Sequence, residues 1–116
     1  MTDVQLCLDY GITTAERFER FHDENPIVYL VLVRLAREWV QRTGRHKVGL
    51  AALRERARWE IAMATNDPDF KLNNNYTPFY ARLIMARCPD LADIFDLRTS
   101  EADAWITTYL QGAPTP

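Results

Sequence analysis

The chain has 116 residues, of which 47% are apolar and 26% are charged, and its net charge is −2. This length fits one domain with its own core, and the composition is that of a globular protein, which argues against disorder except at the ends of the chain. The longest apolar run, residues 27–33, is too short to cross a bilayer, and no segment has the layout of a signal peptide. We therefore expect a cytoplasmic protein that does not bind membranes. Cys7 and Cys88 match no disulfide or metal framework, and Cys88 is expected in the core.

Two signals for the start of a helix occur in the first part of the chain. Thr13 and Glu16 have the spacing of a capping box, which predicts a short helix that ends near Asp23. An asparagine–proline pair then predicts a second helix, which begins at Pro26 and should stop at Gly44. Apolar residues at helical spacing make this second helix the central core helix.

The middle of the chain predicts a link, a helix and a loop. Residues 45–49 can form one short strand, and the apolar spacing then predicts a helix over residues 50–64. Turn-forming residues follow over 65–75, and the alternation of residues 70–72 suggests a second short strand.

Two further helices are predicted after this loop. Thr77 is expected to cap a helix that ends near Arg87, and Pro78 suits its first position. Residues 90–98 form either a helical turn or a short strand. The last helix covers residues 101–110 and is capped by the hydroxyl of a residue just before it, Thr99 or Ser100.

These elements predict a mainly α fold, a compact single-domain helical bundle. We expect a loosely ordered segment over residues 1–12, one helical domain over residues 13–110 and a mobile tail over residues 111–116. The order of a core helix, a link, a helix, a turn and a polar-tipped helix resembles helix-turn-helix and winged-helix domains. The finer expectation is such an arrangement, with one to three very short strands.

The charges are unevenly distributed along the chain. Residues 34–58 carry eight basic and two acidic side chains, whereas residues 1–33 and residues 88–116 are both acidic. Such a central basic segment can form a positive face on a mildly acidic protein. Alternatively, the arginines lie on solvated helix faces and pair with the acidic ends, so the sequence leaves open whether they share one face.

Three consecutive asparagines run into the helix expected after Thr77, so its N-terminal end would display amide, hydroxyl, phenol and guanidinium groups. In helix-turn-helix domains the second helix enters the major groove and its first residues contact base edges, while basic residues hold the phosphates. On this interpretation the nucleic-acid or partner contacts are made by Asn73, Asn74, Asn75, Tyr76, Thr77, Tyr80 and Arg82, and the phosphate contacts by Lys47, Arg54 and Arg58.

Other interpretations of the asparagine run remain open. The run can be a loop that wraps a helix end and satisfies backbone groups, or it can contact a protein. The connection over residues 65–76 is longer than the roughly three or four residues usual in a helix-turn-helix. The acidic last third of the chain would also repel DNA if it lay nearby.

The sequence predicts no enzyme, cofactor or metal ion. Two histidines, one serine and four scattered glycines exclude a glycine-rich phosphate loop and a serine nucleophile elbow. A magnesium-dependent nuclease would need convergent carboxylates, for which Glu60, Asp67 and Asp69 are the candidates. No strand-rich sheet is expected to hold these three side chains together.

A specific pattern occurs in two segments of the chain. The first is RWE at residues 58–60, and the second is residues 70–84, which contain FKLNNNYT followed by YARLI. With Pro89 and Phe95, they resemble a group of small uncharacterised bacteriophage and prophage proteins, over roughly residues 18–98. The resemblance implies a phage or prophage origin and action in the cytoplasm of a bacterial host cell. It implies no activity and no site residues, because the group has no established activity.

We therefore consider two functions. The first is a small phage-type DNA-binding or regulatory protein that uses a helix-turn-helix-like element on double-stranded DNA. The alternative is a phage-encoded protein-interaction module that binds and modulates a host protein and has no affinity for DNA. A homodimer through exposed Trp39, Trp59 or Trp105 is compatible with either function.

Overall fold

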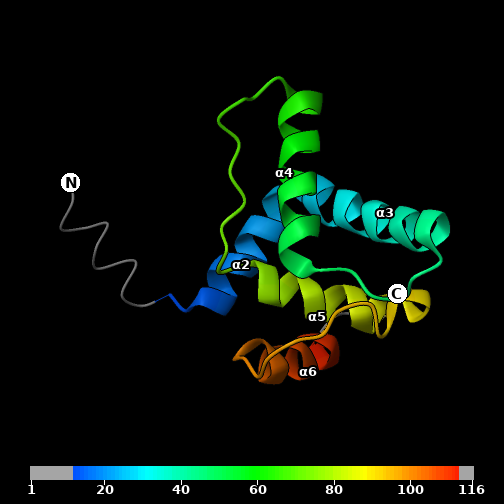
Figure 1. Ribbon diagram of the computed structural model, residues 1–116. Coiled ribbons are helices and arrows are strands. Elements are labelled where there is room, and N and C mark those ends of the chain that lie inside the picture. Colours follow the sequence, from blue (N-terminus) through cyan, green and yellow to red (C-terminus); the bar gives the residue numbers. More distant parts are fainter. Residues whose placement is uncertain (1–11, 113–116) are drawn as a thin grey trace, which may run out of the picture.

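The computed structural model describes residues 12–112 and is mainly helical (Figure 1). The order predicted for residues 1–11 and 113–116 therefore lies outside the described residues. Helices follow one another along the chain and no strand occurs between residues 12 and 112. The elements are α2 (Thr14–Glu24), α3 (Pro26–Thr43), α4 (Leu50–Thr65), α5 (Thr77–Arg87), a 3-10 turn η1 (Pro89–Leu91) and α6 (Ala102–Gly112).

The local signals at the start of α2 and at the end of α3 act as predicted. The expected side-chain cap at Asn25 is absent, because its side-chain amide group donates to the Phe21 carbonyl at 3.0 Å. The Thr13 hydroxyl accepts a hydrogen bond from the Glu16 amide at 3.1 Å, and the Thr13 amide donates to the Glu16 carboxylate at 3.0 Å. At the end of α3, Gly44 adopts the left-handed region with φ of 70° and donates its amide to Val40. The capping box and the glycine stop are confirmed because both depend only on neighbouring residues.

The predicted short strands are not confirmed, and neither is the winged-helix arrangement. A strand needs a ladder of hydrogen bonds to a neighbour. The 45–49 link has one hydrogen bond to a distant backbone group, from the Val48 amide to the Ile94 carbonyl at 3.1 Å. The 70–72 segment starts with a turn from Phe70 to Asp67, and the 90–98 segment begins in η1.

The start of α5 also differs from the prediction. Its N-cap is Tyr76 rather than Thr77, and the buried Thr77 hydroxyl has no hydrogen-bond partner. A Thr77 cap would accept from the amides of Phe79 or Tyr80, but both of these amides bond instead to the Tyr76 carbonyl, at 3.1 Å. A backbone carbonyl therefore takes the place of the expected threonine side chain.

α5 is the central helix of the fold. It contacts α3, α4, α6 and η1, and α3 and α4 cross above it (Figure 1). Phe18 of α2 is fully buried against the rings of Phe79, Tyr80 and Trp105, at centroid distances of 5.4, 4.7 and 5.2 Å. This aromatic cluster joins α2, α5 and α6. Cys88 is buried, as predicted.

Asn66 ends α4 in the left-handed region, and the chain then returns along α4 toward the start of α5 (Figure 1). Leu72 is buried on this path and Phe70 packs against the core. Within the described range, none of the helices has both the length and the apolar character needed to cross a membrane.

Candidate partner-binding groove

Part of the predicted contact set lies in the interior. Thr77 and Arg82 are each 7% exposed, and Tyr80 is completely buried. Arg82 donates to the Asp103 carboxylate at 2.9 Å and to the Arg98 carbonyl at 2.7 Å. Because α5 is enclosed by other helices, these three side chains are not on a surface that could meet DNA or a protein.

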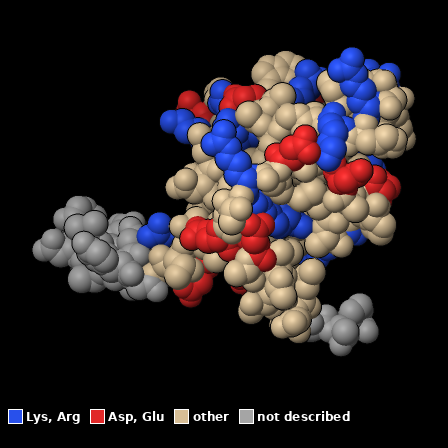
Figure 2. All heavy atoms as spheres, turned by 60° about the horizontal axis from the view of Figure 1, so that its bottom comes forward, with Lys and Arg blue, Asp and Glu red and all other residues tan. Residues whose placement is uncertain are grey.

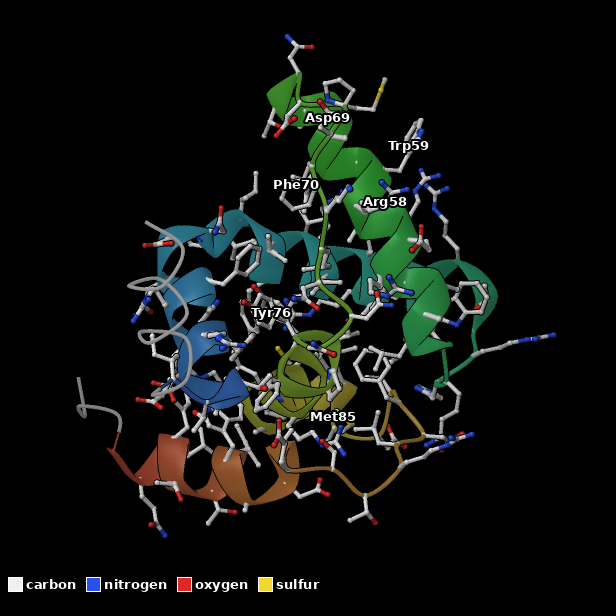
Figure 3. The ribbon with its side chains drawn as sticks, turned by 90° about the vertical axis from the view of Figure 1, so that its left-hand side faces the viewer. Arg58, Trp59, Asp69, Phe70, Tyr76 and Met85 are labelled. Atoms are coloured by element: carbon white, nitrogen blue, oxygen red, sulfur yellow. The ribbon has the colours of Figure 1, made fainter. Side chains whose placement is uncertain are left out.

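The asparagines lie on the surface, but two of them are held by the protein itself. The Asn73 side-chain oxygen accepts from the Asn75 amide at 2.8 Å, and the Asn74 side-chain oxygen accepts from Arg54. Tyr76 turns its ring toward Phe21, at a centroid distance of 5.1 Å, and its position beside α5 is visible in Figure 3. These contacts fit a loop that wraps the start of α5.

Most of the central basic residues pair with carboxylates. Basic and acidic side chains lie interspersed on the face shown in Figure 2, rather than in one positive field. Pairing therefore uses much of the positive charge that residues 34–58 carry. The ion pairs are Arg34–Glu60 (2.5 Å), Arg37–Asp90 (2.9 Å), Lys47–Asp96 (3.0 Å), Arg54–Glu55 (3.1 Å), Arg56–Glu60 (3.1 Å) and Arg58–Glu55 (3.5 Å).

Two of the carboxylates considered for a nuclease take part in contacts within the protein. Partial burial acts to raise the pKa of Glu60, but hydrogen bonds from Arg34 and Arg56 more than offset it and lower that pKa. The Asp67 carboxylate accepts from the Asp69 amide at 3.1 Å within the turn after α4. Over residues 12–112, no three His, Cys, Asp or Glu side chains are grouped as a metal site would require.

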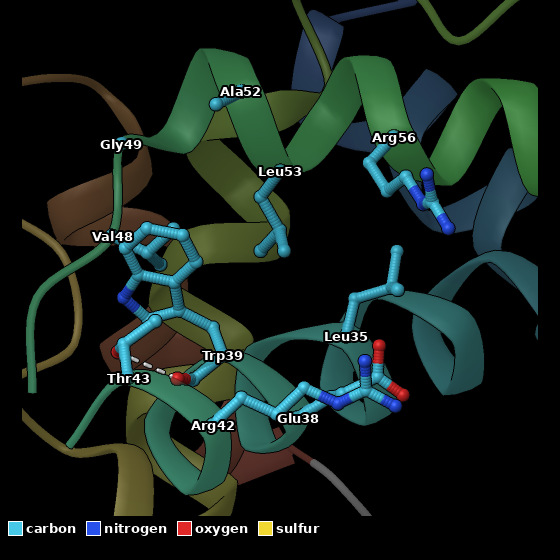
Figure 4. Close-up of a pocket in the computed structure, with 10 residues that line it drawn as sticks. All are labelled: Leu35, Glu38, Trp39, Arg42, Thr43, Val48, Gly49, Ala52, Leu53 and Arg56. Carbon is cyan, nitrogen blue, oxygen red and sulfur yellow. Dashed lines mark hydrogen bonds between the residues drawn. The ribbon is translucent and has the colours of Figure 1, made fainter. Parts of the chain in front are cut away.

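A groove of about 440 Å³ lies between the second half of α3 and the first half of α4 (Figure 4). We call it the α3–α4 groove. Leu35 and Leu53 point into it from the two helices, and Trp39 forms one wall beside Val48. Its remaining lining residues are Glu38, Arg42, Thr43, Gly49, Ala52 and Arg56.

The Trp39 wall is held in place by hydrogen bonds. The indole N–H donates to the Lys47 carbonyl at 2.8 Å, which ties α3 to the link before α4. The Thr43 hydroxyl donates to the Trp39 carbonyl at 2.7 Å, the dashed line in Figure 4, and accepts from the Arg45 amide at 3.1 Å. The indole remains 37% exposed, so its apolar surface faces the groove while its polar atom is satisfied.

A second aromatic side chain lies on the outer surface of α4. Trp59 and Met63 are 56% and 64% exposed and stand one turn apart. The Arg56 guanidinium lies 5.0 Å from the centre of the Trp59 ring, and Figure 3 shows Trp59 pointing away from the body of the protein. The prediction that Trp105 belongs to an exposed patch is wrong. Its side chain is buried, and its indole N–H donates to the Glu19 carboxylate at 2.8 Å.

Sequence reasoning missed this groove. Trp39 is predicted as part of an exposed patch for a homodimer, with no groove beside it, and Arg42 and Arg56 are not in the predicted contact set. The available signal is the pair of small residues, Gly49 and Ala52, at the start of α4, which leaves space opposite Trp39. Comparisons with protein-family models, curated proteins and solved structures found no match to this chain.

Proposed function

We propose that this chain is a protein-interaction module whose binding surface is formed by α3 and α4. The α3–α4 groove supports this proposal, because it is apolar, already open and walled by an anchored tryptophan. Protein interfaces are enriched in Trp, Met and Arg, and their strongest contacts are anchors buried in pockets. Trp59 and Met63 extend the same kind of surface along α4.

The α5 side of the molecule offers much less for recognition. The side chains that suited a recognition helix are buried, and the asparagines beside them bond within the loop. A surface built from α3 and α4 does not need α5 to leave the core. The resemblance to phage and prophage proteins makes a protein of the bacterial host the proposed partner.

The test begins with capture of a host protein from bacterial lysate by the full chain. The captured protein is purified, and its direct binding is measured by isothermal titration calorimetry. Ala52 is exposed and lines the groove, so Ala52→Trp should fill the groove and weaken binding at least about tenfold.

Ala51→Trp is the matched control, because Ala51 is exposed on the same helix and is not among the residues that line the groove. This variant should bind like the wild-type protein. Failure to capture any protein that then binds directly in purified form would overturn the proposal.

Double-stranded DNA is a second candidate, on one specific observation. The side chains of Arg42 and Arg45, at the end of α3, have no acidic partner in the described part of the chain. They are therefore available to phosphates. Fluorescence anisotropy with a random duplex at low and physiological salt tests this candidate. Binding that falls with salt and is lost in Arg42→Gln/Arg45→Gln would favour DNA, and no binding at low salt would exclude it.

A further inference from the structure

The α3–α4 groove combines an apolar interior with a charged rim. Its volume of about 440 Å³ is within the range of ligand-binding pockets. Leu35 and Leu53 form its floor and are only 5% and 4% exposed, whereas Trp39, Val48 and Ala52 present surface from which a partner can displace water. Burial of apolar surface supplies the main favourable free energy in such contacts. The groove therefore suits a large apolar side chain rather than a polar one.

The charges at the rim are not balanced. Glu38 lies 3.7 Å from Arg34, and Arg56 shares Glu60 with that same Arg34. Arg42 lines the groove and finds no acidic partner among residues 12–112. Around the rim three guanidinium groups therefore face two carboxylates, an excess of one positive charge on a protein whose net charge is −2.

Guanidinium groups prefer a particular kind of partner. Arginine binds carboxylates through two parallel hydrogen bonds, which are stronger and more directional than those of neutral groups. A basic segment would be repelled by the rim. A segment without charge would leave Arg42 desolvated and unpaired, which carries a cost.

We infer, on the basis of the proposed function, that the α3–α4 groove binds a partner segment in which a large apolar side chain is flanked by Asp or Glu. The apolar side chain packs against the exposed face of Trp39, over the floor formed by Leu35 and Leu53. The flanking carboxylate pairs with Arg42 at the rim, and Arg56 borders the same opening from α4. Charge complementarity thus selects the segment, and the apolar interior supplies its affinity.

The probe for this inference is a displayed library of random peptides. It is selected in parallel against the wild-type chain, Ala52→Trp, Ala51→Trp and Arg42→Gln, after circular dichroism has verified that all four fold. Wild-type and Ala51→Trp proteins should enrich peptides that carry Leu, Phe, Trp or Met next to Asp or Glu. Ala52→Trp should enrich none of these peptides. Arg42→Gln should keep the apolar preference and lose the acidic one.

One enriched peptide is then synthesised with its acidic residue and with the neutral amide in its place. On the wild-type chain the neutral peptide should bind about tenfold more weakly. On Arg42→Gln the two peptides should bind alike, because the carboxylate has lost its partner. Arg45→Gln is the charge control, since Arg45 lies close by in sequence but does not line the groove, and it should retain the difference between the peptides.

Several results would overturn the inference. Enriched peptides with basic or uncharged flanks, or no enriched peptide at all, would contradict it. Peptides that bind Ala52→Trp as well as the wild type would place recognition elsewhere and leave the proposed protein-interaction function standing. Dimerisation in analytical ultracentrifugation that only Ala52→Trp abolishes would identify a second copy of the chain as the occupant. The proposed function itself fails only in the separate test with a purified host protein.

Discussion

Arg82 of α5 and Arg42 of α3 belong to regions that use the same side chain in different ways. Arg82 is 7% exposed and donates to Asp103, Arg98 and Pro78, so its hydrogen bonds tie α5 to the chain around α6. Arg42 stands at the rim of an open groove and finds no acidic partner among the described residues. The α5 region is closed and satisfied internally, whereas the α3–α4 region keeps polar and apolar groups available.

This difference shows where a binding surface can be expected. A helix start rich in polar side chains looks like a recognition surface in the sequence, yet burial can remove those side chains from any partner. The availability of a charged group depends on which carboxylates the fold brings to it. The following predictions test the contrast between the packed α5 region and the open α3–α4 region.

The largest effect is expected at the aromatic cluster. Phe18→Ala removes a fully buried ring from contact with Phe79, Tyr80 and Trp105. The free energy of unfolding should fall by about 4 kcal/mol, as is usual when a buried phenylalanine is truncated. Urea unfolding followed by circular dichroism measures the change. Trp59→Ala on the exposed face of α4 should cost less than about 1 kcal/mol, and equal losses at the two sites would contradict the contrast.

The next largest effect is expected when the buried and the exposed arginine are each replaced and their free energies of unfolding are compared. Arg82→Met should lower the free energy of unfolding by about 3 kcal/mol, because it removes charged hydrogen bonds made in the interior. Arg42→Met should change it by no more than about 0.5 kcal/mol. Urea midpoints of both variants test the pair. A similar loss at Arg42 would mean that the groove rim is structural rather than available for binding.

A smaller effect is expected at two threonines. Removing the hydroxyl should change the free energy of unfolding in opposite directions at the two positions. Thr77→Val removes a buried hydroxyl that has no hydrogen-bond partner, so it should raise the free energy of unfolding by about 1 kcal/mol. Thr13→Val removes the working cap of α2 and should lower it by about 1 kcal/mol. Thermal unfolding of both variants gives the signs, and destabilisation by Thr77→Val would show that its hydroxyl is satisfied in solution.

The smallest effect is a dependence on pH in the packed region. Burial lowers the pKa of His22 below its usual 6.5, while neighbouring Asp23 acts in the opposite direction. Its ring lies against Phe18 and Tyr80, at centroid distances of 5.8 Å. As the pH falls below 6.5, the unfolded chain therefore takes up this proton before the folded chain does.

The free energy of unfolding contributed by His22 is then greatest above pH 6.5 and decreases until the pH reaches the folded-state pKa. Urea unfolding between about pH 7 and pH 5.5, where few carboxylates titrate, measures this decrease. His22→Gln should reduce the slope, and His46→Gln, at an exposed position, is the control. An unchanged slope in His22→Gln would refute the assignment.

Much of the secondary structure was predictable because it depends on short-range rules. The capping box at Thr13 and the glycine at the end of α3 set those boundaries through hydrogen bonds between neighbours, and the proline at the start of α3 suits a position where no N–H is needed. Ser100 accepts from the Ala102 amide at 3.0 Å, so the predicted hydroxyl at the start of the last helix is present. That helix begins at Ala102 rather than residue 101 and runs two residues past its predicted end, to Gly112.

The candidate site was not predictable in the same way. Asn73, Asn74 and Asn75 drew attention because amides suit base edges, but their contacts depend on Arg54 and on the turn that the loop forms. The position of Trp39 in its helix does not reveal what its ring faces. Only the position of α4 shows that Trp39 is 37% exposed and that its ring faces a groove.

The sequence by itself determined where the helices begin and end, that Cys88 and the apolar stripes are buried, and that positive charge concentrates in residues 34–58. The tertiary structure decided which arginines are paired, because their carboxylate partners come from distant parts of the chain, such as Asp90 for Arg37 and Asp103 for Arg82. It also decided that α5 is enclosed and that the α3–α4 groove is open. Packing between helices is set by contacts far apart in sequence, which local patterns do not encode.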